Sequence, residues 1–233
     1  MKYLSKAGIL IAILVVPALV FLGLKFFATN HFKVPYFVPE LDETGQVKTA
    51  GKDTVFHKIP AFNLIDQNGK PFTSAQTKGK VYVADFIFTR CTTICPKMTN
   101  HLARVQESFQ KNPDVLLISH SVDSKFDSPE ILKKFAKKNE AKDGKWFFLT
   151  GEKKAIYDLG INGYKISVAD ASAYDKNVSI DETFIHTDKL ILIDKEGYIR
   201  GFYDGTDKEE VDRLMVEIDI LLDNYKKNQD LKR

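Results

Sequence analysis

Two short segments that are apolar on both faces constrain the fold of this chain more than any other feature. Residues 81–88 (VYVADFIF) and 115–122 (VLLISHSV) are rich in β-branched and aromatic side chains. Continuous apolar runs of this length are typical of strands that are covered on both faces of a sheet. The segment 96–109 between them has the pattern of a helix with Pro96 in its first turn. Because parallel strands need such a crossover, the sequence predicts an α/β fold with a buried sheet.

Further elements alternate along the chain. Asn68-Gly69 predicts the turn of a hairpin over residues 61–73. Ser128 as N-cap and Pro129 in the first turn predict a helix that runs to Lys138. The remaining expected elements are a strand at 146–149, a helix at 153–159, hairpin strands at 184–194 and 198–203, and an amphipathic helix at 207–225. This order predicts a thioredoxin-like fold with an insert at about residues 162–180.

The N-terminal residues predict a membrane anchor. Ala7 to Leu24 carries no charged side chain, and as a helix it would extend roughly 27 Å, close to the hydrocarbon thickness of a bilayer. Lys2 and Lys6 would also suit a cleaved signal peptide, but no small-residue cleavage pattern follows. We therefore expect a single-pass transmembrane helix in a bacterial cytoplasmic membrane, with the soluble domain on the periplasmic side, although the charge difference across the segment is slight.

The predicted domain organisation has five parts along the chain. They are a cytoplasmic stub (1–6), the anchor (7–27), a spacer (28–55), the thioredoxin-like domain (56–225) and a polar tail (226–233). The 34 lysines and arginines nearly balance the 31 acidic residues, which leaves a net charge of +3 and argues against a nucleic-acid binder. The pairs Lys133-Lys134 and Lys137-Lys138 are expected to form a solvated helix face, and the sequence identifies no partner for them.

The chain has two cysteines, and both lie where the strand at 81–88 passes into the helix at 96–109. Ligands bind at the carboxyl ends of strands in α/β sheets, and the dipole at a helix N-terminus lowers the pKa of a thiol. The spacing of Cys91 and Cys95 puts two sulfurs on one face of a turn, near enough for a disulfide or for one soft metal ion. The pair therefore predicts either redox chemistry or a site for a metal such as Cu(I).

A third ligand would extend such a site to Cu(II), and the five histidines are the candidates. We expect His31 and His57 to be solvated in or beside the spacer. His101 lies more than one and a half helical turns beyond Cys95, which predicts a surface or packing role. His120 is expected to be a half-buried histidine whose hydrogen bonds are satisfied.

His186 is the remaining histidine, and its position alone leaves its role open. It lies just before the apolar run 190–193, a stretch that packs against the cysteine loop in thioredoxin-like folds. From the residues alone, a ligand and a bystander are equally compatible with this position.

The segment 91–98 (CTTICPKM) after a buried strand resembles the CxxxCP site of the Sco/SenC family. Further matches are SVD at 121–123 with DSP at 127–129, His186-Thr187 before Leu192-Ile193-Asp194, and GYIRGFYDG at 197–205. The resemblance covers roughly residues 55 to 225. Proteins of this family are membrane-anchored copper chaperones that help to metallate the dinuclear copper centre of cytochrome c oxidase.

The resemblance implies a copper site made by two thiolates and one imidazole, those of Cys91, Cys95 and His186. Asp123 and Asp127 also match family positions, where they would shape the loop or cap the following helix. The implied cargo is Cu(I), Cu(II) or both. The implied partners are the copper-receiving subunit of cytochrome c oxidase and, through the N-terminal helix, the membrane. A metallochaperone is favoured over an enzyme.

Other functions stay open. A thiol–disulfide oxidoreductase would cycle Cys91 and Cys95 between dithiol and disulfide and could keep the cysteines of a partner reduced. It would need no distal imidazole, so His186 discriminates between the two hypotheses. A peroxidase of peroxiredoxin type would need activating surroundings that the sequence does not reveal. A merely stabilising disulfide is the weakest alternative, because closing so short a loop constrains the unfolded chain little.

Overall fold

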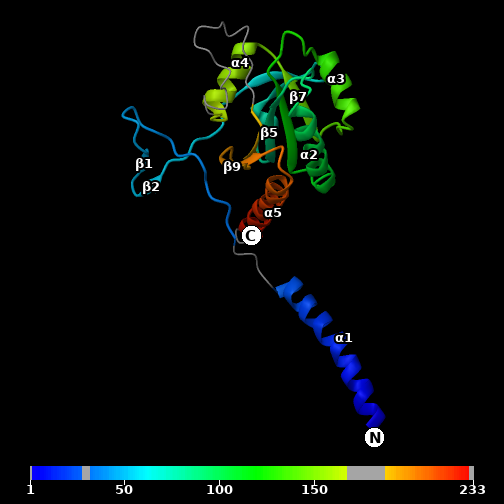
Figure 1. Cartoon of the computed structure of the whole chain (residues 1–233). Coiled ribbons are helices and arrows are strands. Elements are labelled where there is room, and N and C mark those ends of the chain that lie inside the picture. Colours follow the sequence, from blue (N-terminus) through cyan, green and yellow to red (C-terminus); the bar gives the residue numbers. More distant parts are fainter. Residues whose placement is uncertain (1, 28–31, 167–186, 231–233) are drawn as a thin grey trace. The chain divides into compact units, whose positions relative to one another are not determined.

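The structure is a computed structural model, and it describes residues 2–27, 32–166 and 187–230. The chain forms two compact units, residues 1–33 and 34–233. The first unit contains α1 (Lys2–Phe27), so the helix expected at residues 7–27 is confirmed as a helix (Figure 1). In the described ranges, no helix reaches the combination of length and hydropathy that crossing a membrane requires.

The second unit is built on a seven-stranded sheet in the order β4-β3-β7-β6-β5-β8-β9. The strands are β3 (Asn63–Asp66), β4 (Pro71–Thr73), β5 (Val81–Ile87), β6 (Val115–Ser121), β7 (Trp146–Thr150), β8 (Lys189–Ile193) and β9 (Ile199–Asp204). β5, β6 and β7 are parallel to one another, and the outer strands pair antiparallel. The predicted parallel pair is confirmed, because Val81 lies opposite Val115 and the pairing continues along both strands.

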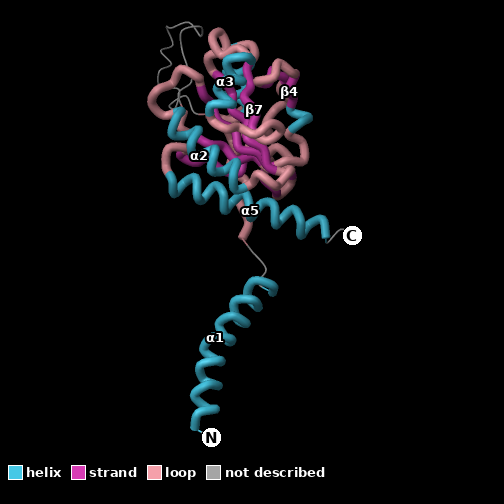
Figure 2. Tube along the Cα trace, turned by 90° about the vertical axis from the view of Figure 1, so that its right-hand side faces the viewer, coloured by secondary structure: helices cyan, strands magenta, loops and turns pink. Residues whose placement is uncertain are grey.

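Helices cover both faces of this sheet and enclose two apolar cores. The face seen in Figure 2 carries α2 (Cys95–Ser108), α3 (Pro129–Lys138) and α5 (Lys208–Asp230). The opposite face carries α4 (Lys153–Asp158) and a π-helical turn at Leu159–Gly163, and a short 3-10 helix, η1 (Ser74–Gln76), follows β4. The predicted start of α3 is confirmed, since the Ser128 hydroxyl accepts a hydrogen bond from the Ile131 N–H at 3.4 Å. The insert expected at 162–180 falls largely outside the described residues.

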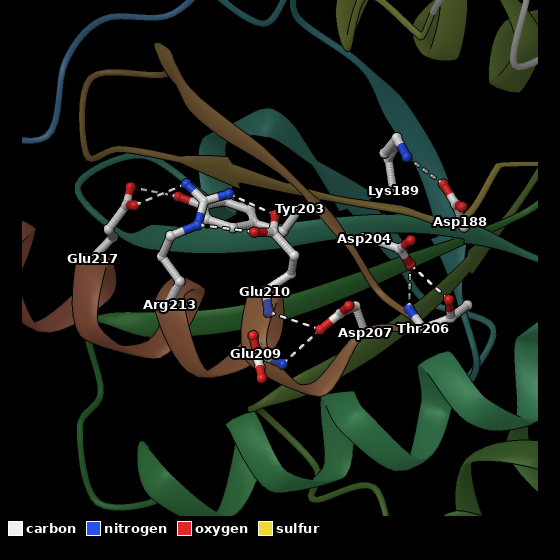
Figure 3. Close-up of polar contacts among 10 residues, drawn as sticks. All are labelled: Asp188, Lys189, Tyr203, Asp204, Thr206, Asp207, Glu209, Glu210, Arg213 and Glu217. Carbon is white, nitrogen blue, oxygen red and sulfur yellow. Dashed lines mark hydrogen bonds and ion pairs between the residues drawn. The ribbon is translucent and has the colours of Figure 1, made fainter.

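Polar contacts fix the closing helix α5 to β9 (Figure 3). Asp207 caps α5, because its carboxylate accepts hydrogen bonds from the backbone of the two residues that follow Lys208, at 2.7 and 3.3 Å. On the next turns, the Arg213 guanidinium lies 4.6 Å from the ring centroid of Tyr203 and pairs with Glu217 at 3.2 Å. The Tyr203 hydroxyl donates to the same Glu217 at 2.6 Å, so β9 and α5 hold each other in register.

The spacer predicted at residues 28–55 is shorter than expected, because most of it belongs to the folded unit. Val34 is buried, and the Arg200 guanidinium on β9 donates to the carbonyl oxygens of Val34 and Pro35. The same guanidinium forms a buried ion pair with Asp194 at 2.7 Å. A small hairpin of β1 (Thr49–Ala50) and β2 (Asp53–Thr54) follows. The boundary between the two units therefore falls after Lys33 in the sequence rather than near residue 55.

Candidate metal and thiol site

The two cysteines occupy the connection from β5 to α2, as the sequence predicts. The chain leaves β5 at Ile87, turns so that the Cys91 N–H donates to the Phe88 carbonyl at 3.1 Å, and enters α2 at Cys95. Both side chains are free thiols. Cys91 is half-buried at the surface, whereas Cys95 is 3% exposed and belongs to the core beneath α2. The pair thus consists of one thiol that a partner can reach and one that it cannot.

The surroundings of the two sulfurs lower the pKa of the more exposed thiol, Cys91, and raise the pKa of the buried thiol, Cys95. Burial raises the pKa of Cys95 to about 12, and the neighbouring Cys91 adds to this effect. At Cys91 burial acts against the thiolate, but hydrogen bonds from the backbone and side chain of Cys95 and from Thr93 outweigh it and lower the pKa. The Thr93 hydroxyl oxygen lies 3.6 Å from the Cys91 sulfur. Cys91 is therefore the nucleophilic thiol of the pair.

We expect alkylating reagents to distinguish the two thiols. At pH 7.5 iodoacetamide should modify Cys91 at least about 10-fold faster than Cys95, because only thiolate reacts and only Cys91 is accessible. Mass spectrometry of peptides from a timed reaction measures both rates in one sample. In Cys91→Ser, Cys95 should stay slow until the protein unfolds in denaturant. Equal rates in the folded protein would contradict the assignment.

Asp127 holds the start of the cysteine loop. Its buried carboxylate accepts hydrogen bonds from the Thr89 backbone N–H at 3.1 Å, from the Thr89 hydroxyl at 2.5 Å and from the Ser121 hydroxyl at 2.5 Å. These bonds join the loop after β5 to the end of β6. Of the two roles that the resemblance implied for Asp127, the structure supports the shaping of the loop, since Ser128 caps α3.

Asp123, whose side chain is buried, supports the same loop through Arg90. Its carboxylate pairs with the Arg90 guanidinium at 2.5 Å, and Arg90 in turn lies over the ring of Phe126, 4.2 Å from its centroid. The Arg90 side chain is 56% exposed and Phe126 is 41% exposed. Because Arg90 directly precedes Cys91, this stacked pair forms part of the surface beside the reachable thiol.

Asp127→Ala should destabilise the protein by about 2 kcal/mol, because it leaves the three donors from Thr89 and Ser121 without their charged acceptor. Urea unfolding monitored by circular dichroism measures the change in free energy. The matched control is Asp158→Ala, since Asp158 is exposed on α4 and pairs with Lys154, one turn away on the same helix. The control should lie within about 0.5 kcal/mol of the wild type. An Asp127 variant as stable as the control would contradict the role of this carboxylate.

A buried carboxylate lies on the strand that leads to the cysteines, and sequence reasoning assigned it no role. Asp85 is fully buried on β5, where it accepts a hydrogen bond from the Ser119 hydroxyl at 2.6 Å. The Trp146 indole N–H donates to the same hydroxyl at 2.9 Å. Burial raises the pKa of Asp85 to about 7, and its charge contributes to the raised pKa of Cys95. The available signal was a single acidic residue within an otherwise apolar strand.

The histidines follow the predictions only in part. His101 has the packing role that was expected, because its Nδ1 lies 2.9 Å from the Gly205 carbonyl oxygen. His57 is not solvated as predicted, since it is half-buried with Nε2 at 2.8 Å from the Gly163 carbonyl oxygen. His120 is fully buried rather than half-buried, and among the described residues its Nδ1 has no hydrogen-bond partner, which contradicts the expectation of a satisfied ring.

His31 and His186 lie outside the described residues. Among residues 2–27, 32–166 and 187–230, no three His, Cys, Asp or Glu side chains gather in a group that could hold a metal ion. The described part of the site therefore consists of two thiols, the half-buried Cys91 and the buried Cys95. The ligand role of His186 stays a prediction.

The fold and the cysteine pair together define a thioredoxin-like protein with a CxxxCP site at the end of a central strand. The sequence profile of the SCO1/SenC family matches residues 50–219. The chain therefore belongs to the SCO1/SenC family.

Individual relatives agree with this assignment. A SCO1 protein homolog of Bacillus subtilis is 32% identical over 169 residues, which cover 72% of this chain and 84% of the relative. The solved SCO1/SenC family lipoprotein of Bacillus anthracis is 32% identical, with a TM-score of 0.61 over 71% of this chain and 95% of that one. A solved ScoI of Bradyrhizobium japonicum with copper bound is 24% identical, covers 70% of this chain and 99% of that one with a TM-score of 0.54, and shares the fold.

Proposed function

We propose that this chain binds copper through Cys91, Cys95 and His186 and delivers it to the dinuclear copper site of cytochrome c oxidase during assembly. The observation that carries the proposal is the pair of thiols between β5 and α2, one of them reachable and of lowered pKa and the other buried beside it. Two soft sulfur ligands favour Cu(I), and an added imidazole also accommodates Cu(II). Copper is the cargo of this reaction.

Contacts after His186 support its assignment as the third ligand. The Gly205 N–H donates to the Asp188 carbonyl at 2.6 Å, and the Gly205 carbonyl contacts the ring of His101 on α2. Thr187, the residue that follows His186, is buried. The backbone that enters β8 is therefore tied to the helix that begins at Cys95, and His186 directly precedes this backbone in the sequence.

The unequal thiols suggest how copper would leave the site. Cys91 is the sulfur that an incoming thiolate of a partner can approach, whereas Cys95 is enclosed by the core under α2. Exchange would begin when the partner thiolate binds the ion and Cys91 is released, and Cys95 would be released last. Each thiol that binds copper loses its proton, so loading releases protons and release of copper takes them up.

The assembly role rests on family membership. The solved structure of the Sco protein BsSco, 31% identical with a TM-score of 0.58, is described as that of a member of the Sco family of cytochrome c oxidase assembly proteins. We extend that role to this chain because it belongs to the same family and carries its cysteine pair with the CxxxCP spacing between β5 and α2.

The experiment that tests the proposal follows copper and electrons separately. The copper-loaded chain is mixed without oxygen with the apo copper-receiving domain of the oxidase subunit, the two proteins are separated, and copper and free thiols are counted on each. Copper should move to the receiving domain while both proteins keep their thiols. If the receiving domain instead gains thiols from a disulfide and takes no copper, the chain acts as an oxidoreductase.

A thiol–disulfide oxidoreductase is the second candidate, and one observation favours it. A reachable thiol of lowered pKa beside a buried thiol of raised pKa is the arrangement in which one sulfur attacks and the other resolves a mixed disulfide. The balanced reaction would oxidise Cys91 and Cys95 to one disulfide and reduce one disulfide of the partner to two thiols. His186 has no part in this reaction, so its replacement should leave the rate of exchange unchanged.

We further propose that α1 attaches the chain to the bacterial cytoplasmic membrane as a single-pass anchor, with the thiol domain on the periplasmic side. Large apolar side chains of α1 such as Leu14 and Phe21 are exposed, and Ala7 to Leu24 carries no charge. Extraction of membranes with alkaline carbonate should leave the full chain in the pellet and release a chain that starts at residue 32. Protease added to intact spheroplasts should then digest the thiol domain.

A further inference from the structure

An exposed aromatic side chain lies beside the reachable thiol. The Arg90 guanidinium stacks over the ring of Phe126, 4.2 Å from its centroid, and Arg90 directly precedes Cys91. Among the described residues after residue 47, Phe126 is the only aromatic one among the exposed large apolar side chains, which are Ile65, Phe126 and Val216. The reachable sulfur is therefore bordered by an exposed arginine and an exposed ring that contact each other.

Hydrogen bonds hold this pair in place without a partner. The buried Asp123 carboxylate accepts from Nε of Arg90 at 3.2 Å and from Nη2 at 2.5 Å. The Asp123 carbonyl accepts the Phe126 N–H at 2.9 Å, so one residue orients both the guanidinium and the backbone that carries the ring. Asp127, which follows Phe126, binds Thr89, which precedes Arg90. Because these groups are already ordered, a partner that covers them loses little conformational entropy.

The pair keeps binding capacity for another molecule. The Arg90 side chain is more than half exposed, and in the part of the chain that the structure describes its Nη1 has no hydrogen-bond partner. Aromatic rings and arginines are the residue types that carry most of the binding energy at the centre of protein interfaces. Since Asp123 balances the charge of Arg90, the surface favours a partner that offers apolar contact and a hydrogen-bond acceptor.

A protein that brings a thiol to Cys91 must cover this pair. Cys91 and Arg90 are consecutive, with Cα atoms about 3.8 Å apart, and Phe126 is in contact with the Arg90 side chain. Each partner in a standard protein interface covers about 800 Å² of surface. An interface centred on Cys91 therefore includes both side chains.

We propose that the Arg90–Phe126 pair is the docking surface for the protein loop whose thiol exchanges with Cys91. That loop would place an apolar side chain on the Phe126 ring and a carbonyl or carboxylate oxygen at Nη1 of Arg90. The inference rests on the proposed function only in that a protein thiol approaches Cys91, a step that copper delivery and disulfide exchange share. Small thiols need no such surface.

The test compares Phe126→Ala with Phe37→Ala in the full chain, held in detergent micelles. Both substitutions remove an exposed phenylalanine ring. The Phe37 N–H donates to the carbonyl of Ile199, and pairing through β8 puts Ile199 level with Tyr82 near the start of β5. The control ring therefore belongs to the opposite end of the strand from Cys91. Phe126→Tyr keeps the aromatic ring and serves as the conservative variant.

The probe is the copper-receiving domain of the oxidase subunit, with one of its cysteines activated as a disulfide with thionitrobenzoate. The Cys91 thiolate attacks the sulfur of that cysteine, the bond to thionitrobenzoate breaks, and the thionitrobenzoate anion leaves as the mixed disulfide with Cys91 forms. The absorbance of the anion gives the rate. The disulfide of free cysteine with thionitrobenzoate offers the same reacting bond without a protein surface.

The wild type should react faster with the domain than with the small disulfide. Phe126→Ala should react with the domain at least about 10-fold more slowly than the wild type, by the same factor at low and high salt. Phe37→Ala and Phe126→Tyr should stay within about 3-fold of the wild type. All four proteins should react equally with the small disulfide.

Equal rates of Phe126→Ala and Phe37→Ala with the domain would overturn the proposal, as would a wild type that reacts no faster with the domain than with the small disulfide. Equal slowing of Phe126→Ala with both reagents would also overturn it, because the ring would then act on the thiol itself. If Phe126→Ala abolishes only a self-association seen by light scattering, the occupant is a second copy and the proposal is wrong. Copper transfer to the unlabelled domain is measured separately. If docking depends on Phe126 but copper stays on the chain, the docking surface stands and the copper-delivery function fails.

Discussion

Copper affinity should fall by at least about 100-fold when either Cys91 or Cys95 is replaced by serine, because a soft thiolate is exchanged for a hydroxyl that binds Cu(I) poorly. The wild type should bind one copper ion per chain. A competition titration with a colourless Cu(I) chelator, under reducing conditions and without oxygen, measures all variants on one scale.

His186→Ala should lower the affinity for Cu(II) much more than the affinity for Cu(I). With both thiolates retained, Cu(I) can remain two-coordinate, so its affinity should fall only about 10-fold, while Cu(II), which needs more ligands, should be lost. The absorption band of thiolate bound to Cu(II) reports this directly. His57→Ala is the matched control, since His57 bonds to the Gly163 carbonyl, which has no part in the proposed site, and should bind no metal.

The pattern of losses decides between the functions. If the serine variants lose copper and His186→Ala equals the His57→Ala control, the third ligand is wrong and a two-thiol site remains. If the wild type itself does not compete with the chelator, the copper function fails, and the redox potential of the Cys91–Cys95 pair becomes the quantity to measure.

Asp85→Asn should make the protein progressively more stable than the wild type as the pH rises. The pKa of Asp85 is about 7 in the folded protein, raised by burial from its ordinary value of 3.8. The folded state therefore holds a proton that the unfolded state releases. This contribution to stability is fully present below about pH 4 and is lost as the pH rises through 7.

The difference in unfolding free energy between Asp85→Asn and the wild type should shift by about 3 kcal/mol between pH 5 and pH 8 in favour of the variant. Urea titrations at four pH values measure this shift, and the fixed cost of burying the amide cancels in the comparison. A flat profile for Asp85→Asn would mean that this carboxyl is already ionised in the folded protein over this pH range, which would contradict its raised pKa.

Short sequence patterns were sufficient to predict those elements whose structure depends on residues nearby in the sequence. The buried strands β5 and β6, the capped start of α3 and the position of the cysteine pair all follow from short segments, and all are confirmed. The shape of the cysteine loop could not be predicted in the same way, because Thr89 depends on Asp127, which lies 38 residues away.

The errors have the same cause. Residues 34–55 look like a spacer because they contain proline, glycine and scattered charge, yet Arg200 binds Val34 from 166 residues away. His57 was expected in water because its partner, the Gly163 carbonyl, is 106 residues distant. Long-range hydrogen bonds leave no periodicity in a sequence, and one prediction from the resemblance, His186, falls outside the described residues.

The single tryptophan of the chain has a consequence for how this protein can be observed. Trp146 is fully buried and reaches Asp85 through the Ser119 hydroxyl, on the face of the sheet that also encloses Cys95. Its fluorescence comes from one known place, so the emission needs no deconvolution. One optical signal should therefore report loss of the core, ionisation of Asp85 and quenching by an ion bound at the thiols, without any attached dye.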